Sequence, residues 1–203
     1  KFINKNLNSQ SFIHSVSGGT DIVSCFMLGI PTLPVYSGEI QGPGLGMNID
    51  VYNEKGKPTK KTGELVCKTP FPSKPIYFWN DKLNRKYKSA YFEKFPNIWA
   101  HGDYVKKTNN GGYVIFGRSD ATLNPGGVRI GTGEIYNSLQ KFHWIEDCLA
   151  TGYMTENDEK IVLFLKLSNS KMSIDFRSVL KKHLKASLSP RHVPWKVFVV
   201  KDI

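Results

Sequence analysis

The chain has 203 residues, of which 40% are hydrophobic and 22% are charged, so it can bury the core of one large or two small domains. No internal repeat or low-complexity tract occurs, which argues against a solenoid or a disordered chain. The longest apolar run, 161–167, is too short for a membrane span, and residues 1–10 lack the apolar core of a signal peptide.

The chain has 28 Lys and Arg against 17 Asp and Glu, a net charge of +11 that is compatible either with a polyanionic partner or with a surface that is simply rich in lysine. A nucleic acid is one alternative and a phosphorylated small molecule is another. The lysines are spread along the chain, and the densest group (Lys181, Lys182, Lys185) lies on one expected helix without a stacking pattern of aromatic residues. We therefore expect no nucleic acid and no membrane partner.

The cysteines are Cys25, Cys67 and Cys148, an odd number without a C-x-x-C pair. This spacing indicates neither a disulfide framework nor a zinc site. Reduced thiols in a cytoplasmic protein are the expectation.

Residues 12–116 contain short apolar runs separated by turn residues, which predicts a β-rich region. The expected strands are 32–36, 47–53 and 63–68. Two further alternating runs flank the tip residues 109–112, which tolerate positive φ, and together they predict a β-hairpin over 103–117.

After residue 120 the pattern changes to that of a small α+β unit. Thr132 is expected to cap a helix that buries Ile135, Leu139 and Phe142, with Glu134 in its first turn. Two strands over 145–153 and 161–167, a second helix and a last strand over 193–200 follow. The second helix is expected to start at Ser173, to bury Phe176, Leu180 and Leu184, and to end before Pro190.

The stretch GRSDATLNPGGVRIGTGE at 117–134 joins the two regions. It fits neither a Walker loop nor a G-x-G-x-x-G fingerprint. Its glycines would let backbone amides approach a ligand, and Arg118 and Arg129 could bind phosphate or ribose oxygens. Glycines that serve only turns remain the alternative.

Two other segments carry candidate site residues. In SVSGGTD at 15–21, Thr20 could contact a phosphate and Asp21 could hold Mg²⁺, although a turn followed by a capped helix over TDIVSCFMLG is equally compatible. In HGDYV at 101–105, Asp103 could accept hydrogen bonds from a ribose diol, or could simply be a hairpin residue.

Taken together, SGGTDIVSCF, GELVCKTPFPSKPIYFWND, WAHGDYV, GRSDATLNPGGVRIGTGEIY and SPRHVPW make the chain resemble the adenylate-forming superfamily of acyl-CoA synthetases, luciferases and peptide-synthetase adenylation domains. The resemblance covers nearly the whole chain. It implies an α+β fold, in which residues 1–119 form the β-rich end of the large AMP-binding domain. Residues 120–203 would form most of a small C-terminal lid domain.

The resemblance also implies roles for individual residues. Thr20 would touch the nucleotide phosphate and Asp21, where relatives usually carry Glu, would hold Mg²⁺. Asp103 would bind both ribose hydroxyls with the help of Arg118. Arg129 would reach a phosphate during adenylation, so Thr20 and Arg129 are the expected catalytic residues.

Further roles concern CoA and domain movement. Gly126 and Gly127 would present loop backbone to the pantetheine arm of CoA, and Lys181 lies where some relatives place a CoA-binding arginine. A solvated helix face is the alternative for Lys181. Asp120 takes the position of the hinge about which the lid rotates.

The stretch Ser17, Gly18 and Gly19 replaces the bulky residues that shorten the acyl pocket of acetate-activating relatives. The resemblance therefore implies a roomier pocket, suited to acetoacetate, with propionate or butyrate not excluded by size. The expected reaction joins acetoacetate to CoA through an acyl-adenylate, with ATP, CoA and Mg²⁺.

The family's phosphate loop with its lysine is expected before residue 1, and its catalytic lysine a few residues after Ile203. We therefore expect the 203-residue chain to be a fragment that needs the N-terminal region of the same protein and does not adenylate alone. Another short-chain acyl-CoA synthetase, or a nucleotide- or CoA-binding module without catalysis, are the alternatives.

Overall fold

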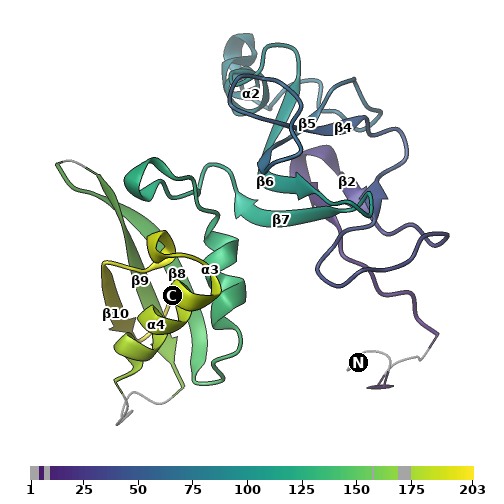
Figure 1. Cartoon of the computed structure of the whole chain (residues 1–203). Helices are drawn as coiled ribbons and strands as arrows, with labels where there is room; N and C mark the ends of the chain where they lie inside the picture. The colour runs from purple at the N-terminus through teal and green to yellow at the C-terminus, as the bar shows by residue number, and fades with distance from the viewer. Residues whose placement is uncertain (1–4, 7–9, 157, 169–174) are drawn as a thin grey trace. The chain divides into compact units, whose positions relative to one another are not determined.

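The computed structural model describes residues 5–6, 10–156, 158–168 and 175–203. The chain folds into two compact units, Lys1–Ile115 and Phe116–Ile203. Figure 1 shows both units. These units reflect internal packing, and the domain division at 119/120 stays a prediction.

The first unit contains two small sheets. One has the order β1-β2-β3, with antiparallel pairing throughout. The other has the order β4-β5-β6-β7 (Figure 1). The strands are β1 (Ser17–Gly19), β2 (Ser24–Leu28), β3 (Gly42–Pro43), β4 (Ile49–Tyr52), β5 (Gly63–Cys67), β6 (Trp99–Lys107) and β7 (Tyr113–Arg118), and the last three residues of β7 belong to the second unit.

Most of the expected strands are confirmed in this unit. Strands β4 and β5 lie within the ranges predicted at 47–53 and 63–68. Strands β6 and β7 form the predicted hairpin, whose tip is closed by hydrogen bonds from the Thr108 amide to the Gly112 carbonyl and from the Gly111 amide to the Thr108 carbonyl. Alternating apolar residues around turn residues were therefore sufficient to predict these strands from the sequence.

The strand predicted at 32–36 is wrong, because this segment forms a loop. Pro31 and Pro34 remove amide donors that a sheet ladder would need. The side-chain amide of Gln41 instead donates to the carbonyls of Ile30 at 3.0 Å and Leu33 at 2.7 Å. A side chain from outside the segment thus provides the hydrogen bonds that the loop carbonyls would otherwise make to a neighbouring strand.

Helical segments of the first unit also depart from expectation. Residues that could have formed a helix over TDIVSCFMLG instead form a short 3₁₀ helix, η1 (Thr20–Ile22), followed by β2. The prediction missed α2 (Arg85–Phe92), which follows η2 (Lys82–Asn84). The carboxylate of Asp81 accepts hydrogen bonds from the amides of Lys86 and Tyr87 and so stabilises the start of α2.

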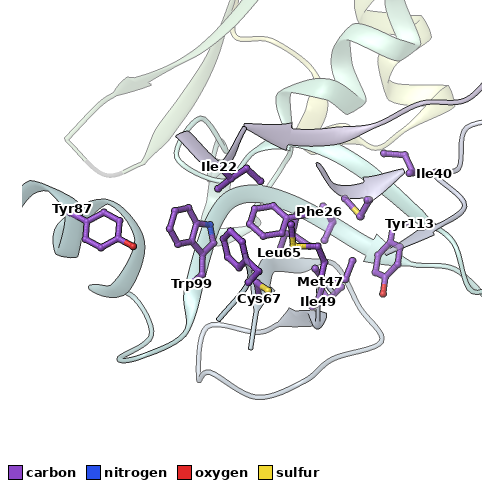
Figure 2. Close-up of a cluster of buried hydrophobic side chains, with 14 residues drawn as sticks. Ile22, Phe26, Ile40, Met47, Ile49, Leu65, Cys67, Tyr87, Trp99 and Tyr113 are labelled. Atoms are coloured by element: carbon purple, nitrogen blue, oxygen red, sulfur yellow. The ribbon is translucent and has the colours of Figure 1, made fainter. Parts of the chain in front are cut away.

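The core of the first unit combines aliphatic side chains with a group of aromatic rings that includes Phe26, Tyr87 and Trp99 (Figure 2). The Trp99 ring is 2% exposed and stacks on Tyr91, with ring centroids 3.7 Å apart. Phe26 of β2 contacts Trp99 and also meets the His101 ring edge to face, at 4.7 Å. The sheet that contains β1 and β2 is thereby packed against β6.

The second unit has a three-stranded sheet of order β10-β9-β8, in which β8 and β9 are antiparallel and β10 is parallel to β9. Two helices, α3 and α4, accompany it (Figure 1). The elements are η3 (Pro125–Gly127), α3 (Thr132–Leu139), β8 (Ile145–Met154), β9 (Glu159–Leu167), α4 (Phe176–Ser187), η4 (Pro190–His192) and β10 (Lys196–Val200). The predicted α+β class is confirmed.

The helix caps differ in detail from the prediction. Gly131, and not Thr132, is the N-cap of α3, and its amide donates to Glu134 Oε1 at 3.1 Å. Ser173, the predicted cap of the second helix, lies outside the described residues. Asp175 caps α4 by accepting a hydrogen bond from the Ser178 amide.

The core of the second unit forms between its helices and its sheet. Leu180 and Leu184 of α4 are fully buried, and Leu163 of β9 is buried in the same cluster. Cys25, Cys67 and Cys148 are free thiols. Within the described ranges no helix is both long and apolar enough to cross a membrane.

Leu180→Ala should destabilise the second unit by about 2 to 5 kcal/mol, because it removes buried methyl groups and leaves a cavity. Hydrogen exchange of the β9 amides would measure this loss. Val179→Ala, at the 41% exposed neighbouring position of the same helix, is the control and should change stability by less than about 0.5 kcal/mol. Equal effects of the two variants would contradict the assigned core.

Candidate functional site

In the first unit, the structure brings together two residues that were predicted to serve different parts of a ligand. The Ser17 hydroxyl of β1 donates to Asp103 Oδ2 of β6 at 3.0 Å. Both residues are buried, at 6% and 9% exposure. A hydrogen bond to a carboxylate in such surroundings is stronger than one between neutral groups, so Ser17 fixes the orientation of Asp103.

His101 lies beside this pair and was not among the predicted site residues. Its Nε2 is 3.1 Å from the Gly18 carbonyl oxygen and 3.8 Å from Asp103 Oδ2. A Cβ on Gly19 would lie only 3.1 Å from His101 Cε1. The imidazole therefore occupies the space that the missing side chain of Gly19 leaves on this side.

Gly18 has a different packing role. A Cβ at this position would come within 2.1 Å of the Ser24 carbonyl oxygen, because β1 and β2 approach closely here. Close packing thus accounts for part of the glycine content of this stretch. The role of Ser17, Gly18 and Gly19 in lining an acyl pocket stays a prediction.

Thr20 and Asp21 are exposed in η1, directly after β1. The Asp21 carboxylate accepts a hydrogen bond from the Tyr91 hydroxyl. One carboxylate next to a hydroxyl fits Mg²⁺, which binds one or two carboxylates together with water and substrate phosphate oxygens. The described part of the chain contains no group of three or more His, Cys, Asp or Glu side chains that could hold a metal ion.

In the second unit, the expected ribose ligand and the expected hinge residue form an ion pair. Arg118 donates from Nε and Nη2 to the two carboxylate oxygens of Asp120, each at 3.3 Å. Their side chains are 51% and 69% exposed. Such exposed pairs contribute about 0 to 1 kcal/mol, so a competing ligand could separate them at little cost.

The loop of η3 contains the two glycines expected to face CoA. Gly126 has φ 59° and Gly127 has φ 73°, values that favour glycine. A Cβ on Gly126 would lie 2.1 Å from Arg191 Nη1, whereas a Cβ on Gly127 would meet nothing within 4 Å. Gly126 is therefore packed against a side chain, and Gly127 faces open space.

The two other glycines of this stretch, Gly131 and Gly133, allow α3 to begin close to the end of β7. A Cβ would lie 2.4 Å from the Phe116 carbonyl oxygen at Gly131 and 2.6 Å from it at Gly133. The predicted phosphate-reaching residue Arg129 is exposed on the loop before α3, and Lys181 is half-buried on α4. Their ligand roles stay predictions.

The turn at SPRHVPW is joined to α3 through His192. His192 Nε2 lies 3.4 Å from Glu134 Oε2, and His192 Nδ1 lies 2.8 Å from the Ser189 hydroxyl. Burial by itself would raise the pKa of Glu134, but His192 and the Gly131 amide outweigh burial and lower this pKa. Ionised Glu134 therefore stabilises the start of α3, immediately after the glycine loop.

The structure is similar in fold to the o-succinylbenzoate CoA synthetase MenE of Bacillus subtilis, solved with ATP and magnesium, at a TM-score of 0.73 and 18% identity over 93% of this chain and 38% of that one. At that identity the likeness concerns the fold alone. Acetoacetyl-CoA synthetase from Streptomyces lividans is more similar, with a TM-score of 0.86 and 41% identity over 95% of this chain and 29% of that one.

Curated relatives agree with this assignment. The chain is 49% identical over its whole length to acetoacetyl-coenzyme A synthetase of Rhizobium meliloti and 46% identical to acetoacetyl-CoA synthetase of Gallus gallus. It spans 31% of the length of each and matches their C-terminal part. No family model matches. The resemblance to adenylate-forming acyl-CoA synthetases is confirmed, and the chain corresponds to the C-terminal part of acetoacetyl-CoA synthetases.

Sequence reasoning missed three residues that contact predicted ones. His101 contacts Gly18, Asp158 accepts a hydrogen bond from the Gly126 amide, and Arg191 donates to the Gly126 carbonyl. His101 is the first residue of the HGDYV segment that contains the predicted Asp103, so its position was a usable signal. Arg191 contacts Pro125 and Gly126, some 65 residues earlier in the chain. No local pattern could have indicated that contact.

Ser17→Ala should destabilise the first unit by about 1 to 3 kcal/mol, because the buried Asp103 carboxylate loses a donor. Hydrogen exchange of β1 and β6 amides would measure the change. Ser24→Ala is the control, since Ser24 is exposed on the strand paired with β1. If the two variants are equally stable, Ser17 does not hold Asp103 in solution.

Glu134→Gln should remove a pH-dependent part of the stability of the second unit. Because the folded pKa of Glu134 lies below its ordinary 4.5, ionised Glu134 stabilises the fold above that pH, and the contribution is lost as pH falls through the folded pKa. Urea unfolding measured from neutral pH to about pH 3 should show the wild type losing its advantage over Glu134→Gln.

Glu156→Gln, at an exposed turn position, is the control and should follow the wild-type pH profile. A constant difference between wild type and Glu134→Gln at every pH would show that ionisation of Glu134 is not involved.

Proposed function

We propose that this chain is part of an ATP-dependent acid–thiol ligase that converts acetoacetate, CoA and ATP to acetoacetyl-CoA, AMP and pyrophosphate. The observation that carries the proposal is the 49% identity, across the whole chain, to a relative named acetoacetyl-coenzyme A synthetase. Since the chain spans 31% of that relative, the activity is proposed for the full-length protein. A cytoplasmic location forms part of the proposal.

In the first step, a carboxylate oxygen of acetoacetate attacks the α-phosphorus of ATP, and the bond to the pyrophosphate oxygen breaks. Asp103, oriented by Ser17, would accept hydrogen bonds from the ribose hydroxyls. Thr20 would donate its hydroxyl to a phosphate oxygen, and Arg129 would stabilise the charge that develops there. Holding both reactants in place would supply much of the rate enhancement.

Asp21 would supply one carboxylate ligand to Mg²⁺ next to the phosphates. The bound ion would neutralise phosphate charge during adenylation. Tyr91, whose hydroxyl donates to Asp21, would keep the carboxylate oriented.

In the second step, the CoA sulfur attacks the acyl carbon, the bond to the AMP oxygen breaks and AMP leaves with the electron pair, while the thiol proton passes to solvent. Gly126 and Gly127 would lie along the pantetheine arm, and Lys181 would meet the CoA nucleotide. Asp120 would act as the hinge between the two steps. The weak, exposed Arg118–Asp120 pair is compatible with a segment that changes conformation.

The acid would be selected near Ser17, Gly18 and Gly19. His101 fills the space on one side of Gly19, so it would limit how much room the glycines add. A four-carbon oxo acid would fit the space that these glycines leave. Size alone would discriminate only weakly between acids of similar length, because one methylene contributes about 1 to 3 kcal/mol.

The full-length protein should release pyrophosphate from ATP with acetoacetate and form the CoA thioester. We expect its kcat/KM for acetoacetate to exceed that for acetate or butyrate by about tenfold or more. Coupled pyrophosphate release and mass spectrometry of the thioester would measure both. Faster turnover of acetate or butyrate would reassign the acid.

The 203-residue chain alone is expected to release no pyrophosphate. Calorimetric titration of this chain with ATP, AMP and CoA would measure whether it binds a nucleotide or CoA by itself.

The alternative is a binding module without catalysis. Tight binding of AMP or CoA by a full-length protein that turns over none of the acids would identify such a module.

A further inference from the structure

The glycine loop in the second unit is held through its backbone by charged side chains from two distant segments. On one side, Gly126 N donates to Asp158 Oδ1 at 2.7 Å. On the other, Arg191 Nη1 donates to the carbonyl oxygens of Gly126 at 2.8 Å and Pro125 at 3.2 Å. The backbone amide and the carbonyl oxygen of Gly126 are thus both hydrogen-bonded to ionisable side chains.

Neighbouring contacts reinforce this arrangement. Asn124 N donates to Glu159 Oε2 at 2.7 Å, and Lys160 Nζ donates to Asp158 Oδ2 at 2.9 Å. The hydrogen bonds from Lys160 and from the Gly126 amide lower the pKa of Asp158. Asp158 therefore stays an acceptor over the physiological pH range.

The base of the loop is also closed. Leu123 and Ile130 exchange two backbone hydrogen bonds, of 2.8 and 2.7 Å, as an isolated antiparallel bridge. Inside this closed loop, Gly126 and Gly127 both have positive φ. Without outside contacts such a short glycine segment would have many accessible conformations, since glycine loses more backbone entropy on ordering than any other residue.

The two glycines have different surroundings, which gives the loop a side that is packed and a side that is open. Arg191 Nη1 occupies the position that a Gly126 Cβ would need, at 2.1 Å. Nothing lies within 4 Å of the position of a Gly127 Cβ. A ligand that runs along the loop would therefore pass Gly127, while Gly126 is attached to the rest of the unit.

We propose that Arg191 and Asp158 are positioning residues that hold the Gly126–Gly127 backbone in the conformation used by the pantetheine arm of CoA. The inference rests on the proposed function. It assigns a role in the thioester-forming step to Arg191 of the SPRHVPW segment and to Asp158, which lies between β8 and β9. Neither side chain would touch the reacting atoms. Both would act by lowering the entropy that the loop loses when CoA binds.

A merely structural role predicts a different outcome. The core of the second unit consists of apolar residues such as Leu163, Leu180 and Leu184, and neither Arg191 nor Asp158 belongs to it. Arg191 is exposed and Asp158 is half-buried. Their removal should therefore leave the unit folded and affect the loop in particular.

Arg191→Ala in the full-length protein is the decisive test. Acetoacetate-dependent exchange of pyrophosphate into ATP, measured without CoA, should stay within about twofold of wild type, whereas kcat/KM for CoA should fall by about tenfold or more. Arg191→Lys keeps a cationic donor but loses the planar guanidinium, and should recover part of the loss. Hydrogen exchange of the Gly126 and Gly127 amides should accelerate in Arg191→Ala.

Arg177→Ala is the matched control, because Arg177 also donates to a backbone carbonyl of this unit, that of Val197 at 3.3 Å, but not to the loop. It should leave both half-reactions unchanged. If Arg191→Ala does not fold, the pair Asp158→Ala and Asp158→Asn decides. Asn retains an oxygen acceptor for the Gly126 amide, so only the Ala variant should show the selective CoA defect.

The inference is overturned if Arg191→Ala, or Asp158→Ala in its place, lowers both half-reactions equally or leaves kcat/KM for CoA unchanged in an active enzyme. If the wild-type enzyme shows no acetoacetate-dependent exchange of pyrophosphate into ATP, the proposed function itself is refuted, and the proposed CoA role of the loop is refuted with it.

Discussion

The packing of Phe26 against the Trp99 ring (Figure 2) and against the His101 ring is the contact on which the first unit depends. Phe26 comes from β2 and both partners come from β6, so burial of this ring packs the two sheets against each other, in addition to the backbone bridge between Ile40 and Tyr113. Burying aromatic surface of this size is among the larger favourable terms in folding. Because β1 pairs with β2, the same contact brings Ser17 within hydrogen-bonding distance of Asp103.

The second unit combines an apolar core with a polar scaffold around its glycine loop. Leucines from α4 and β9 provide the stability, while Asp158, Glu159 and Arg191 hold the loop through hydrogen bonds to its backbone. These two kinds of interaction are separable. A loop held by charged groups outside the apolar core can be altered without loss of that core, which allows a small domain to keep its fold while its ligand-facing segment adapts.

Sequence patterns predicted the elements whose stability is local. The tip of the β6–β7 hairpin has residues that tolerate positive φ, and the apolar spacing of α3 and α4 follows one helix face, so these were recognised. The segment 32–36 was misassigned because Gln41 satisfies its carbonyls from outside. The helix α2 was missed because its start depends on Asp81, and its Tyr87 is buried against the aromatic core.

For the site, the sequence by itself determined the family resemblance and the identity of Thr20, Asp21, Asp103, Arg118 and the glycine stretch as candidates, since these residues occur in ordered motifs. Only the tertiary structure decided that Ser17 orients Asp103, that His101 fills the space beside Gly19, and that Arg191 holds Gly126. The physical reason is distance along the chain. These contacts join residues 65 to 86 positions apart, and no local propensity or periodicity encodes a pairing that depends on how sheets and turns pack.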